Sequence, residues 1–202
     1  IARGQKEYTF VTDWMRKFGV GHDFDVISID GEAYRVKIKD EDSSTVNLAD
    51  KGMGSIQLMI LLLRLATILR EYAPQNMVAL EDNDKLRYPT IVIEEPEQNL
   101  HPKVQSQLAD LFLYLNKEYH CKFVVETHSE YLIRKTQVLV SKENFEDNSS
   151  MKENNPFMVY YFDGENEKEP YYPMEYRTDG NFSNEFGTGF FDAATKLLYE
   201  IL

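Results

Sequence analysis

One short stretch, residues 90–102 (TIVIEEPEQNLHP), constrains the fold of this chain more than any other. It opens with a β-branched run that stops at two carboxylates, Glu94 and Glu95, and Pro96 then ends the strand because it has no N–H to donate. An apolar run of this length predicts a strand buried on both faces, as in a parallel sheet. Open α/β sheets bind ligands at the carboxyl ends of their strands, so the two acids are expected at a binding site.

The acid pair also predicts a cation. Burying two adjacent like charges costs free energy unless a positive charge compensates them. A magnesium ion that carries a nucleotide phosphate would compensate Glu94 and Glu95, so the pair favours a nucleotide site.

Length, charge and cysteine content exclude several classes of protein. With 202 residues the chain is one domain or one large lobe, long enough to bury a core. Its net charge of −12 argues against a protein that coats nucleic acid with basic surface. The single cysteine, Cys121, cannot form an intrachain disulfide, and no Cys/His spacing indicates zinc. The most apolar segment, residues 58–69, is shorter than the ~20 residues that span a bilayer, so we expect a cytoplasmic protein without membrane contact.

The beginning of the chain predicts a helix and a β-hairpin. Apolar residues recur near helical spacing over residues 8–18, and Gly19 follows where helices commonly end. Residues 24–29 and 34–38 alternate in polarity around an Asp-Gly pair, which is a hairpin signal.

A glycine-rich entry precedes a second helix. Asp50, Gly52, Gly54 and Ser55 lead into residues 56–72, which are apolar almost all round and predict a central buried helix. The orphan N–H groups at the start of such a helix bind anions. The alternative interpretation is a tight turn capped by Ser55, and the entry by itself leaves both open.

A βαβ unit follows the connector formed by residues 73–88. Pro102 suits the first turn of a helix, residues 104–119 carry an apolar stripe, and residues 121–126 form a second apolar strand. Because a βαβ unit places its two strands parallel and adjacent, residues 126–129 are expected beside the acid pair.

The C-terminal part predicts smaller elements. We expect a helix at 130–139, a polar loop or disordered stretch at 141–156, strands at 157–162 and 171–176, a loop at 180–189 and a helix at 190–202. The chain is therefore divided into residues 1–140 and a C-terminal extension, residues 141–202, of loop, β-hairpin and terminal helix.

Three motifs occur in a fixed order: residues 52–57 (GMGSIQ), 91–96 (IVIEEP) and 125–129 (VETHS). This order resembles the C-terminal half of an ABC-type ATPase domain, with its signature motif, Walker B strand and D-loop, and switch-histidine loop. The closest resemblance is to the AAA ATPases of the overcoming-lysogenization-defect and RecF-like branch, in which E-P-E-x-x-L-H-P follows Walker B and the switch loop is E-T-H-S. Residues 177–192, including the run GTGFFD, resemble a C-terminal domain of unknown function found on some prokaryotic ATPases of that branch.

The resemblance implies an α/β fold: the distal lobe of a P-loop (ABC-type) ATPase, with a mostly parallel sheet flanked by helices and added β-hairpins. It implies that residues 1–140 are the lobe that carries signature, Walker B and switch histidine. Glu94 stands where the Walker B acid holds magnesium, although aspartate is more usual there. Glu95 stands where the general base polarises the water that attacks the γ-phosphate, and His128 matches the histidine that senses that phosphate.

The resemblance also implies a second copy of the protein at the nucleotide. Asn99 and His101 occupy the D-loop, which contacts the partner subunit, although His101 could instead cap the next helix. Gly52, Gly54 and Ser55 would present N–H and hydroxyl groups to the γ-phosphate of ATP bound on the other subunit.

A phosphate loop, G-x-x-x-x-G-K-[ST], is absent from the sequence. In this family it lies N-terminal to the motifs found here, so we expect this chain alone to bind ATP weakly or not at all and to be inactive. In a complete protein, a homodimer would close around two ATP molecules and open on hydrolysis. Such clamps commonly serve DNA repair or phage defence, so DNA and a nuclease are candidate partners.

Two alternatives remain. A metal-dependent nuclease or phosphatase could use Glu94, Glu95, His101 and His128, but acids on one strand tip lack the dispersed ligands that a two-metal site draws on. It also leaves the glycine-rich entry unexplained. The second alternative is a non-catalytic dimerisation or regulatory module, against which the presence of Glu95 argues mildly.

Overall fold

The computed structural model describes residues 3–72, 88–142, 155–163 and 170–201, without the side chains of residues 194–195. The chain forms two compact units: residues 1–104 with 114–127, and residues 105–113 with 128–202. Most of the predicted connector and polar loop, and residues 164–169, lie outside the described residues. The predicted division of the chain into residues 1–140 and a C-terminal extension, residues 141–202, stays a prediction.

The first helix, α1 (Lys6–Lys17), forms as its apolar spacing predicts. It buries Phe10, Val11, Trp14 and Met15 on one face. Its C-cap is Phe18, and Gly19 follows with a φ of 71°, in the left-handed region that glycine adopts without strain.

The predicted hairpin is confirmed and gains a third strand. β1 (Asp23–Ile29) pairs antiparallel with β2 (Ala33–Lys39), which pairs in turn with β3 (Thr45–Asn47). Asp30 and Gly31 turn the chain with φ values of 51° and 76°, as a tight hairpin turn requires.

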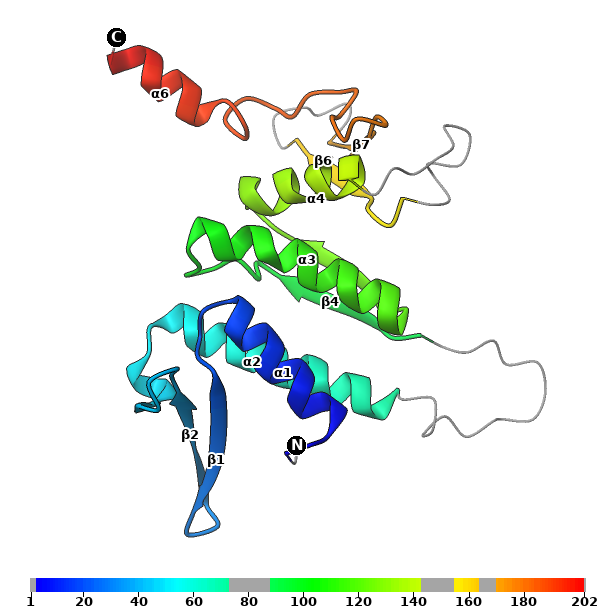
Figure 1. Ribbon diagram of the computed structural model, residues 1–202. Coiled ribbons are helices and arrows are strands. Elements are labelled where there is room, and N and C mark those ends of the chain that lie inside the picture. Colours follow the sequence, from blue (N-terminus) through cyan, green and yellow to red (C-terminus); the bar gives the residue numbers. More distant parts are fainter. Residues whose placement is uncertain (1–2, 73–87, 143–154, 164–169, 202) are drawn as a thin grey trace, which may run out of the picture. The chain divides into compact units, whose positions relative to one another are not determined.

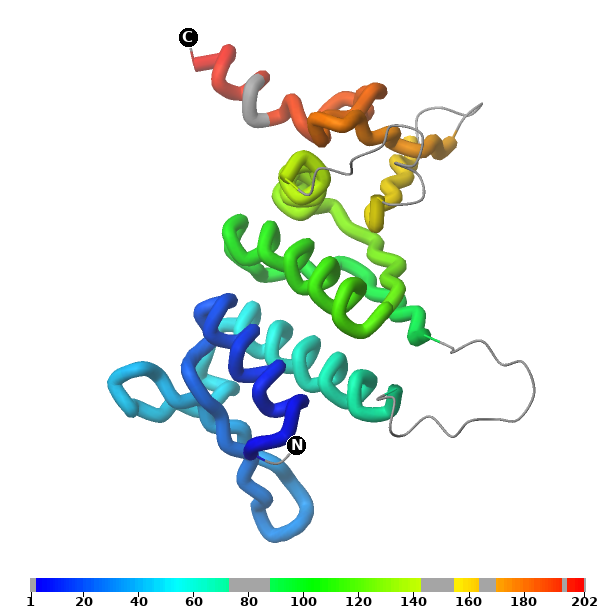
Figure 2. Tube along the Cα trace, turned by 45° about the vertical axis from the view of Figure 1, so that its right-hand side comes forward, coloured from blue at the N-terminus to red at the C-terminus, as the bar shows by residue number. Residues whose placement is uncertain are grey.

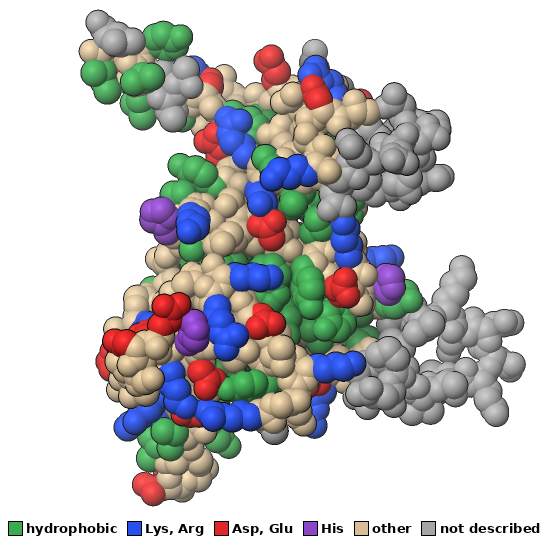
Figure 3. Space-filling view, in the orientation of Figure 1, with side chains coloured by type: hydrophobic (Ala, Val, Ile, Leu, Met, Phe, Trp, Pro, Cys, Tyr) green, Lys and Arg blue, Asp and Glu red, His purple; other side chains and the backbone are tan. Residues whose placement is uncertain are grey.

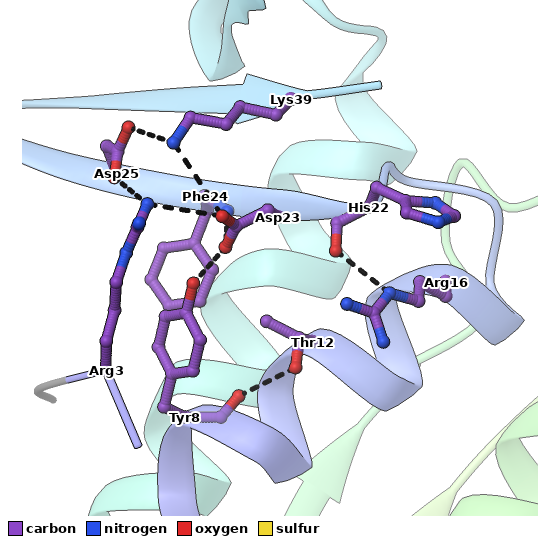
Figure 4. A network of polar contacts seen from close by, with 9 residues as sticks. All are labelled: Arg3, Tyr8, Thr12, Arg16, His22, Asp23, Phe24, Asp25 and Lys39. Atoms are coloured by element: carbon purple, nitrogen blue, oxygen red, sulfur yellow. Dashed lines mark hydrogen bonds and ion pairs between the residues drawn. The ribbon is translucent and has the colours of Figure 1, made fainter. Parts of the chain in front are cut away.

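A network of charged and polar groups ties α1 to this hairpin (Figure 4). Tyr8 donates a hydrogen bond to Asp23, and Arg3 forms ion pairs of 3.2 Å with Asp23 and 2.7 Å with Asp25. Lys39 lies 2.7 Å from Asp25 and lowers the pKa of that carboxyl by hydrogen bonding and by its charge. The network therefore joins the N-terminal residues Arg3 and Tyr8 to both strands of the hairpin, which are distant from them in sequence.

The long apolar helix α2 (Met53–Glu71) follows a short 3₁₀ turn, η1 (Leu48–Asp50), and lies beside α1 (Figures 1 and 2). Its buried side chains are Leu58, Met59, Leu62, Leu65, Ala66 and Leu69. Ile60 on another face is 56% exposed, so the prediction of a fully buried central helix is wrong in part, because other described elements do not cover that face. By length and composition alone, α2 is long and apolar enough to span a membrane. The core helix of a soluble protein meets the same two criteria.

The predicted βαβ unit is confirmed. β4 (Thr90–Glu94) and β5 (Lys122–Glu126) are parallel neighbours joined by α3 (Pro102–Tyr119), which begins at Pro102 as expected. Val92 is 69% exposed and Val124 is 56% exposed, so burial on both faces was a wrong prediction for β4. The side chains are exposed because the sheet is small: it has only these two strands within the described part of the chain. The predicted mostly parallel sheet is therefore confirmed only as this parallel pair.

The second unit holds the C-terminal elements. They are α4 (Glu130–Lys142), the antiparallel pair β6 (Val159–Phe162) and β7 (Tyr171–Met174), and α6 (Ala193–Ile201), which begins three residues later than predicted. Aromatic rings between β6 and α6 contact one another; they are Tyr161, Tyr172, Phe182, Phe186, Phe190 and Phe191. The apolar side chains of α6 are largely exposed (Figure 3).

Candidate functional site

The predicted acids meet at the carboxyl ends of two parallel strands. Glu94 is the register partner of Glu126, and the N–H of Glu95 donates a 2.9 Å hydrogen bond to the carbonyl of Glu126. A carboxylate oxygen of Glu95 lies within 4.8 Å of one of Glu126. The expectation that the tip of the second strand lies beside the acid pair is therefore confirmed for Glu126.

The backbone of Glu95 adopts an unusual conformation. Its φ is 43°, in the left-handed region that non-glycine residues rarely enter, and Pro96 follows directly. Gln98 closes a turn by donating its N–H to the Glu95 carbonyl at 3.1 Å, and its side-chain amide donates to the Glu95 carboxylate. This turn holds the Glu95 carboxylate at the strand end. Strained backbone of this kind is concentrated at functional sites.

The loop beyond Glu95 docks on the start of α2. Asn99, with φ 57°, donates a 3.1 Å hydrogen bond from its side-chain amide to the Gln57 side chain. The Asn99 carbonyl oxygen would lie 2.6 Å from a Cβ placed on Gly54, so only glycine permits this approach. Gly54, Gln57 and Asn99 thereby join the predicted signature segment to the predicted D-loop within one chain.

Sequence reasoning missed the parts played by Gln57 and Gln98. The only available signal was position, since Gln98 lies three residues after Glu95 in a turn and Gln57 three residues after Gly54 on a helix.

The glycine-rich entry is anchored from the first unit. Lys51 Nζ lies 2.9 Å from the Asp40 carboxylate and donates to the Val20 carbonyl at 2.8 Å. The N-cap of α2 is Gly52, and no side chain caps it, so the alternative of a turn capped by Ser55 is wrong. The Ser55 N–H instead bonds to the Gly52 carbonyl at 2.9 Å. The exposed Gly52 and Met53 leave this helix start open to solvent.

A hollow of about 610 Å³ lies between α2 and β4 in the first unit. Gln57 and Arg64 line it from α2, and Ile91 and Ile93 line it from β4. The acid pair borders the same hollow, which therefore gives Glu94 and Glu95 access to a space of ligand size.

The two predicted histidines have different positions. His101 is the N-cap of α3, where its Nδ1 accepts a 3.3 Å hydrogen bond from the Lys103 N–H. His101 therefore has a local capping role, whatever it contacts in a partner. His128 is exposed, comes two residues after Glu126, and is the first residue of the second unit. Ser129, the next residue, is buried and caps α4 by accepting the Leu132 N–H at 3.1 Å.

Comparison with protein families matches residues 6–133 to the AAA ATPase domain. This match spans most of the chain and contains every predicted site residue. The chain belongs to the AAA ATPase domain family. The acids at the ends of β4 and β5 thus lie in an ATPase-type, nucleotide-binding module, although no nucleotide contact follows from the match itself.

Two solved structures are among those similar to this AAA ATPase domain. One comes from work on the structural biochemistry of ATP-driven dimerization and DNA-stimulated activation of SMC ATPases; it is 13% identical with a TM-score of 0.47, and the match covers 96% of this chain and 90% of that one. The other is the Smc head domain from Pyrococcus furiosus with an extended coiled coil, bound to the C-terminal domain of ScpA. It is 16% identical with a TM-score of 0.45, and the match covers 64% of this chain and 29% of that one. A search of curated proteins finds no match.

Proposed function

We propose that this AAA ATPase domain is the distal lobe of an ABC-type head that binds and hydrolyses ATP in the complete protein and dimerises on ATP. The observation that carries the proposal is the strand-end arrangement of Glu94, Glu95 and Glu126. Register and a main-chain hydrogen bond hold these residues together, and a hollow adjoins the acid pair. The phosphate loop would come from sequence outside the chain described here, because these 202 residues contain none.

The strand-end acids have the donor chemistry that magnesium requires. Mg²⁺ prefers oxygen ligands and usually keeps several waters, and Glu94 offers an exposed carboxylate at the end of β4. When bound with ATP, the ion would supply positive charge against the phosphate oxygens. Glu94 is proposed to hold it, while Glu95, aimed by its turn and by Gln98, accepts the proton of the attacking water.

The remaining site residues are assigned by the same proposal. His128 donates a hydrogen bond to the γ-phosphate from the segment that follows β5. Gly52, Gly54 and Ser55 present the open start of α2 to the nucleotide of a second copy. Asn99 and His101 contact that second copy through the D-loop, and the hydrogen bond from Asn99 to Gln57 would make the two elements move together.

The finer identity belongs to the same proposal. We propose that the protein belongs to the overcoming-lysogenization-defect and RecF-like branch, with residues 141–202 as the C-terminal domain found on ATPases of that branch, and the order of its motifs supports this proposal. A cytoplasmic clamp in DNA repair or phage defence, acting on DNA or beside a nuclease, fits this placement.

The decisive experiment is Glu95→Gln in the protein that contains this chain. Loss of a general base reduces catalysis about 10²–10⁴-fold, so we expect ATP to be bound but retained, with a longer-lived dimer. Glu118→Gln, an exposed glutamate on α3, is the matched control and should turn over ATP normally. Hydrolysis by Glu95→Gln at the wild-type rate would refute the role of Glu95.

Residues 1–202 alone provide a second test. We expect them to remain monomeric with ATP, because they contain no phosphate loop. An ATP-dependent dimer in sedimentation would contradict this.

A metal-dependent nuclease remains the second candidate, because carboxylate oxygens of Glu95 and Glu126 approach within 4.8 Å. It predicts DNA cleavage by this chain with Mg²⁺ or Mn²⁺ and without nucleotide. The ATPase proposal predicts none.

A further inference from the structure

The second unit begins at His128 and continues directly into α4. Ser129 is 4% exposed, donates a 2.6 Å hydrogen bond to the Gln105 side chain and accepts the Leu132 N–H. Ser129 thus caps α4 and ties its start to Gln105. His128 directly precedes this capped residue, so a shift of the start of α4 would be passed along the chain to the backbone of His128.

The chain beyond β7 passes close to α4 (Figures 1 and 2), and three contacts join the two. The Tyr176 hydroxyl lies 2.6 Å from the hydroxyl of the buried Thr136. Gly180, with φ 82°, lies so close to α4 that a Cβ there would be 2.2 Å from the Gln137 carbonyl oxygen.

The third contact is linked to the first turn of α4 through an ion pair. The Arg134 guanidinium lies over the Phe191 ring, 4.1 Å from its centre. Arg134 also forms a 2.5 Å ion pair with Glu130, the first residue of α4 and the second after His128. Phe191 therefore connects to the helix start through one side chain.

Phe191 is itself held by neighbouring rings. Phe186 and Phe190 lie 4.7 Å and 5.0 Å from it between ring centres, and Phe186 also contacts Phe182 and Phe190. A residue locked in this way can restrain Arg134, whereas an isolated surface ring could not. We propose that the C-terminal segment, residues 176–191, positions His128 for its role at the nucleotide, with Phe191 acting through Arg134 and Glu130.

The inference rests on the proposed function for the identity of what His128 contacts, but not for the coupling itself. Phe191 touches no reacting group and is a positioning residue. Positioning of His128 in this way would let the C-terminal extension control ATP hydrolysis, so a partner that binds this extension would change the rate of hydrolysis.

The coupling is tested first in residues 1–202 by NMR. Phe191→Leu removes the ring but keeps an apolar side chain, whereas Phe191→Tyr retains the ring. Phe162→Leu is the matched control, because Phe162 is an exposed ring of the same unit whose ring partner is Tyr171.

Loss of a cation–π contact predicts about threefold faster hydrogen exchange of the Leu132 amide in Phe191→Leu. The Cε1–H resonance of His128 should also move. The other three histidines, His22, His101 and His120, lie in the first unit and should not change. An unchanged His128 resonance in a folded Phe191→Leu, or an equal change in Phe162→Leu, would overturn the inference.

Steady-state hydrolysis in the complete protein is the second arm. We expect Phe191→Leu to lower kcat about threefold with KM for ATP unchanged, and Phe191→Tyr to restore it. If Glu95→Gln abolishes hydrolysis while Phe191→Leu leaves kcat unchanged, the function stands and the positioning inference fails. If the wild-type protein does not hydrolyse ATP, the proposed function fails, and the NMR arm still decides whether Phe191 acts on His128.

Discussion

The segments that follow the two parallel strands are held by different parts of the chain. After β4, residues 95–100 are tied to themselves by turns and to α2 through Asn99 and Gly54. After β5, the chain enters α4, whose start is tied through Ser129 to Gln105, 24 residues earlier, and whose later residues contact a segment about 40 to 60 residues further on, as with Thr136 and Tyr176. The first arrangement combines local turns with contacts to α2, where Asn99 and Gln57 are 42 residues apart, whereas the second also needs the C-terminal extension.

This difference assigns different sensitivities to the two candidate catalytic residues. Changes in residues 95–100 or at the start of α2 should disturb Glu95, and changes in the C-terminal extension should disturb His128. Substitutions that alter one segment and spare the other test the comparison.

The largest effect is expected for Gly180→Ala. The new Cβ would meet the Gln137 carbonyl at 2.2 Å, at a φ of 82° that alanine adopts only with strain, so the free energy of unfolding of the second unit should fall by about 3 kcal/mol. Hydrogen exchange of the α4 amides measures the loss. Gly31→Ala has a similar φ of 76° but open space around it, and should cost only about 1 kcal/mol, in the first unit.

The comparison fails if Gly180→Ala, a substitution in the second unit, destabilises the first unit equally. Trp14 is the single tryptophan and lies in the first unit, so its fluorescence during urea unfolding reports that unit separately. If Gly180→Ala lowered the free energy of unfolding reported by Trp14 fluorescence as much as that reported by hydrogen exchange in α4, the two segments would not be held independently.

Gly54→Ala is the corresponding test of the first segment. Alanine gains about 1 kcal/mol of helix propensity, yet its Cβ would lie 2.6 Å from the Asn99 carbonyl and 3.0 Å from a Leu100 methyl. We expect the clash to win, with a net loss of about 2 kcal/mol by Trp14 fluorescence. Gly52→Ala has nothing within 4 Å and should lose less than about 1 kcal/mol. A stabilised Gly54→Ala would mean that the loop does not rest on α2.

The sequence predicted the helices and strands of this comparison and missed most of the side-chain contacts that hold the two segments. The strand run, the proline stop and the Asp-Gly turn are encoded within a few residues, so β4, the start of α3 and the hairpin were predicted correctly. Periodicity cannot show whether a sheet face is covered, and so the exposure of Val92 and Val124 was missed. The contact between Phe191 and Arg134 joins residues 57 positions apart, which spacing alone does not reveal.

Alkaline pH should weaken the second segment. Burial raises the pKa of Tyr176 to about 12, from 10.0, so above pH 10 the unfolded chain loses this proton before the folded chain does. The resulting stability is complete below pH 10 and is lost as pH rises toward 12, by about 1.4 kcal/mol at pH 11. Tyr176→Phe cannot ionise and avoids this loss, but it forfeits the hydrogen bond to Thr136, about 1 kcal/mol.

Urea unfolding at pH 8 and pH 11 separates the two contributions. The variant should be the less stable protein at pH 8, and the difference should close or reverse at pH 11. A constant difference at both pH values would show that Tyr176 is not buried against α4 in solution.

The smallest expected effect concerns Glu95 and has the opposite sign. Asparagine tolerates the left-handed backbone better than glutamate, so Glu95→Asn should raise the free energy of unfolding of the first unit by ~0.5–1 kcal/mol, even though the contact from Gln98 is lost. Glu94→Asn is the matched control, because it lies in the regular strand, where asparagine is unfavourable and should destabilise. Stabilisation by Glu95→Asn together with lost ATP hydrolysis would show that the strain is kept for catalysis. Destabilisation by both substitutions would instead mean that the Gln98 contact outweighs the strain and that the turn is built for stability.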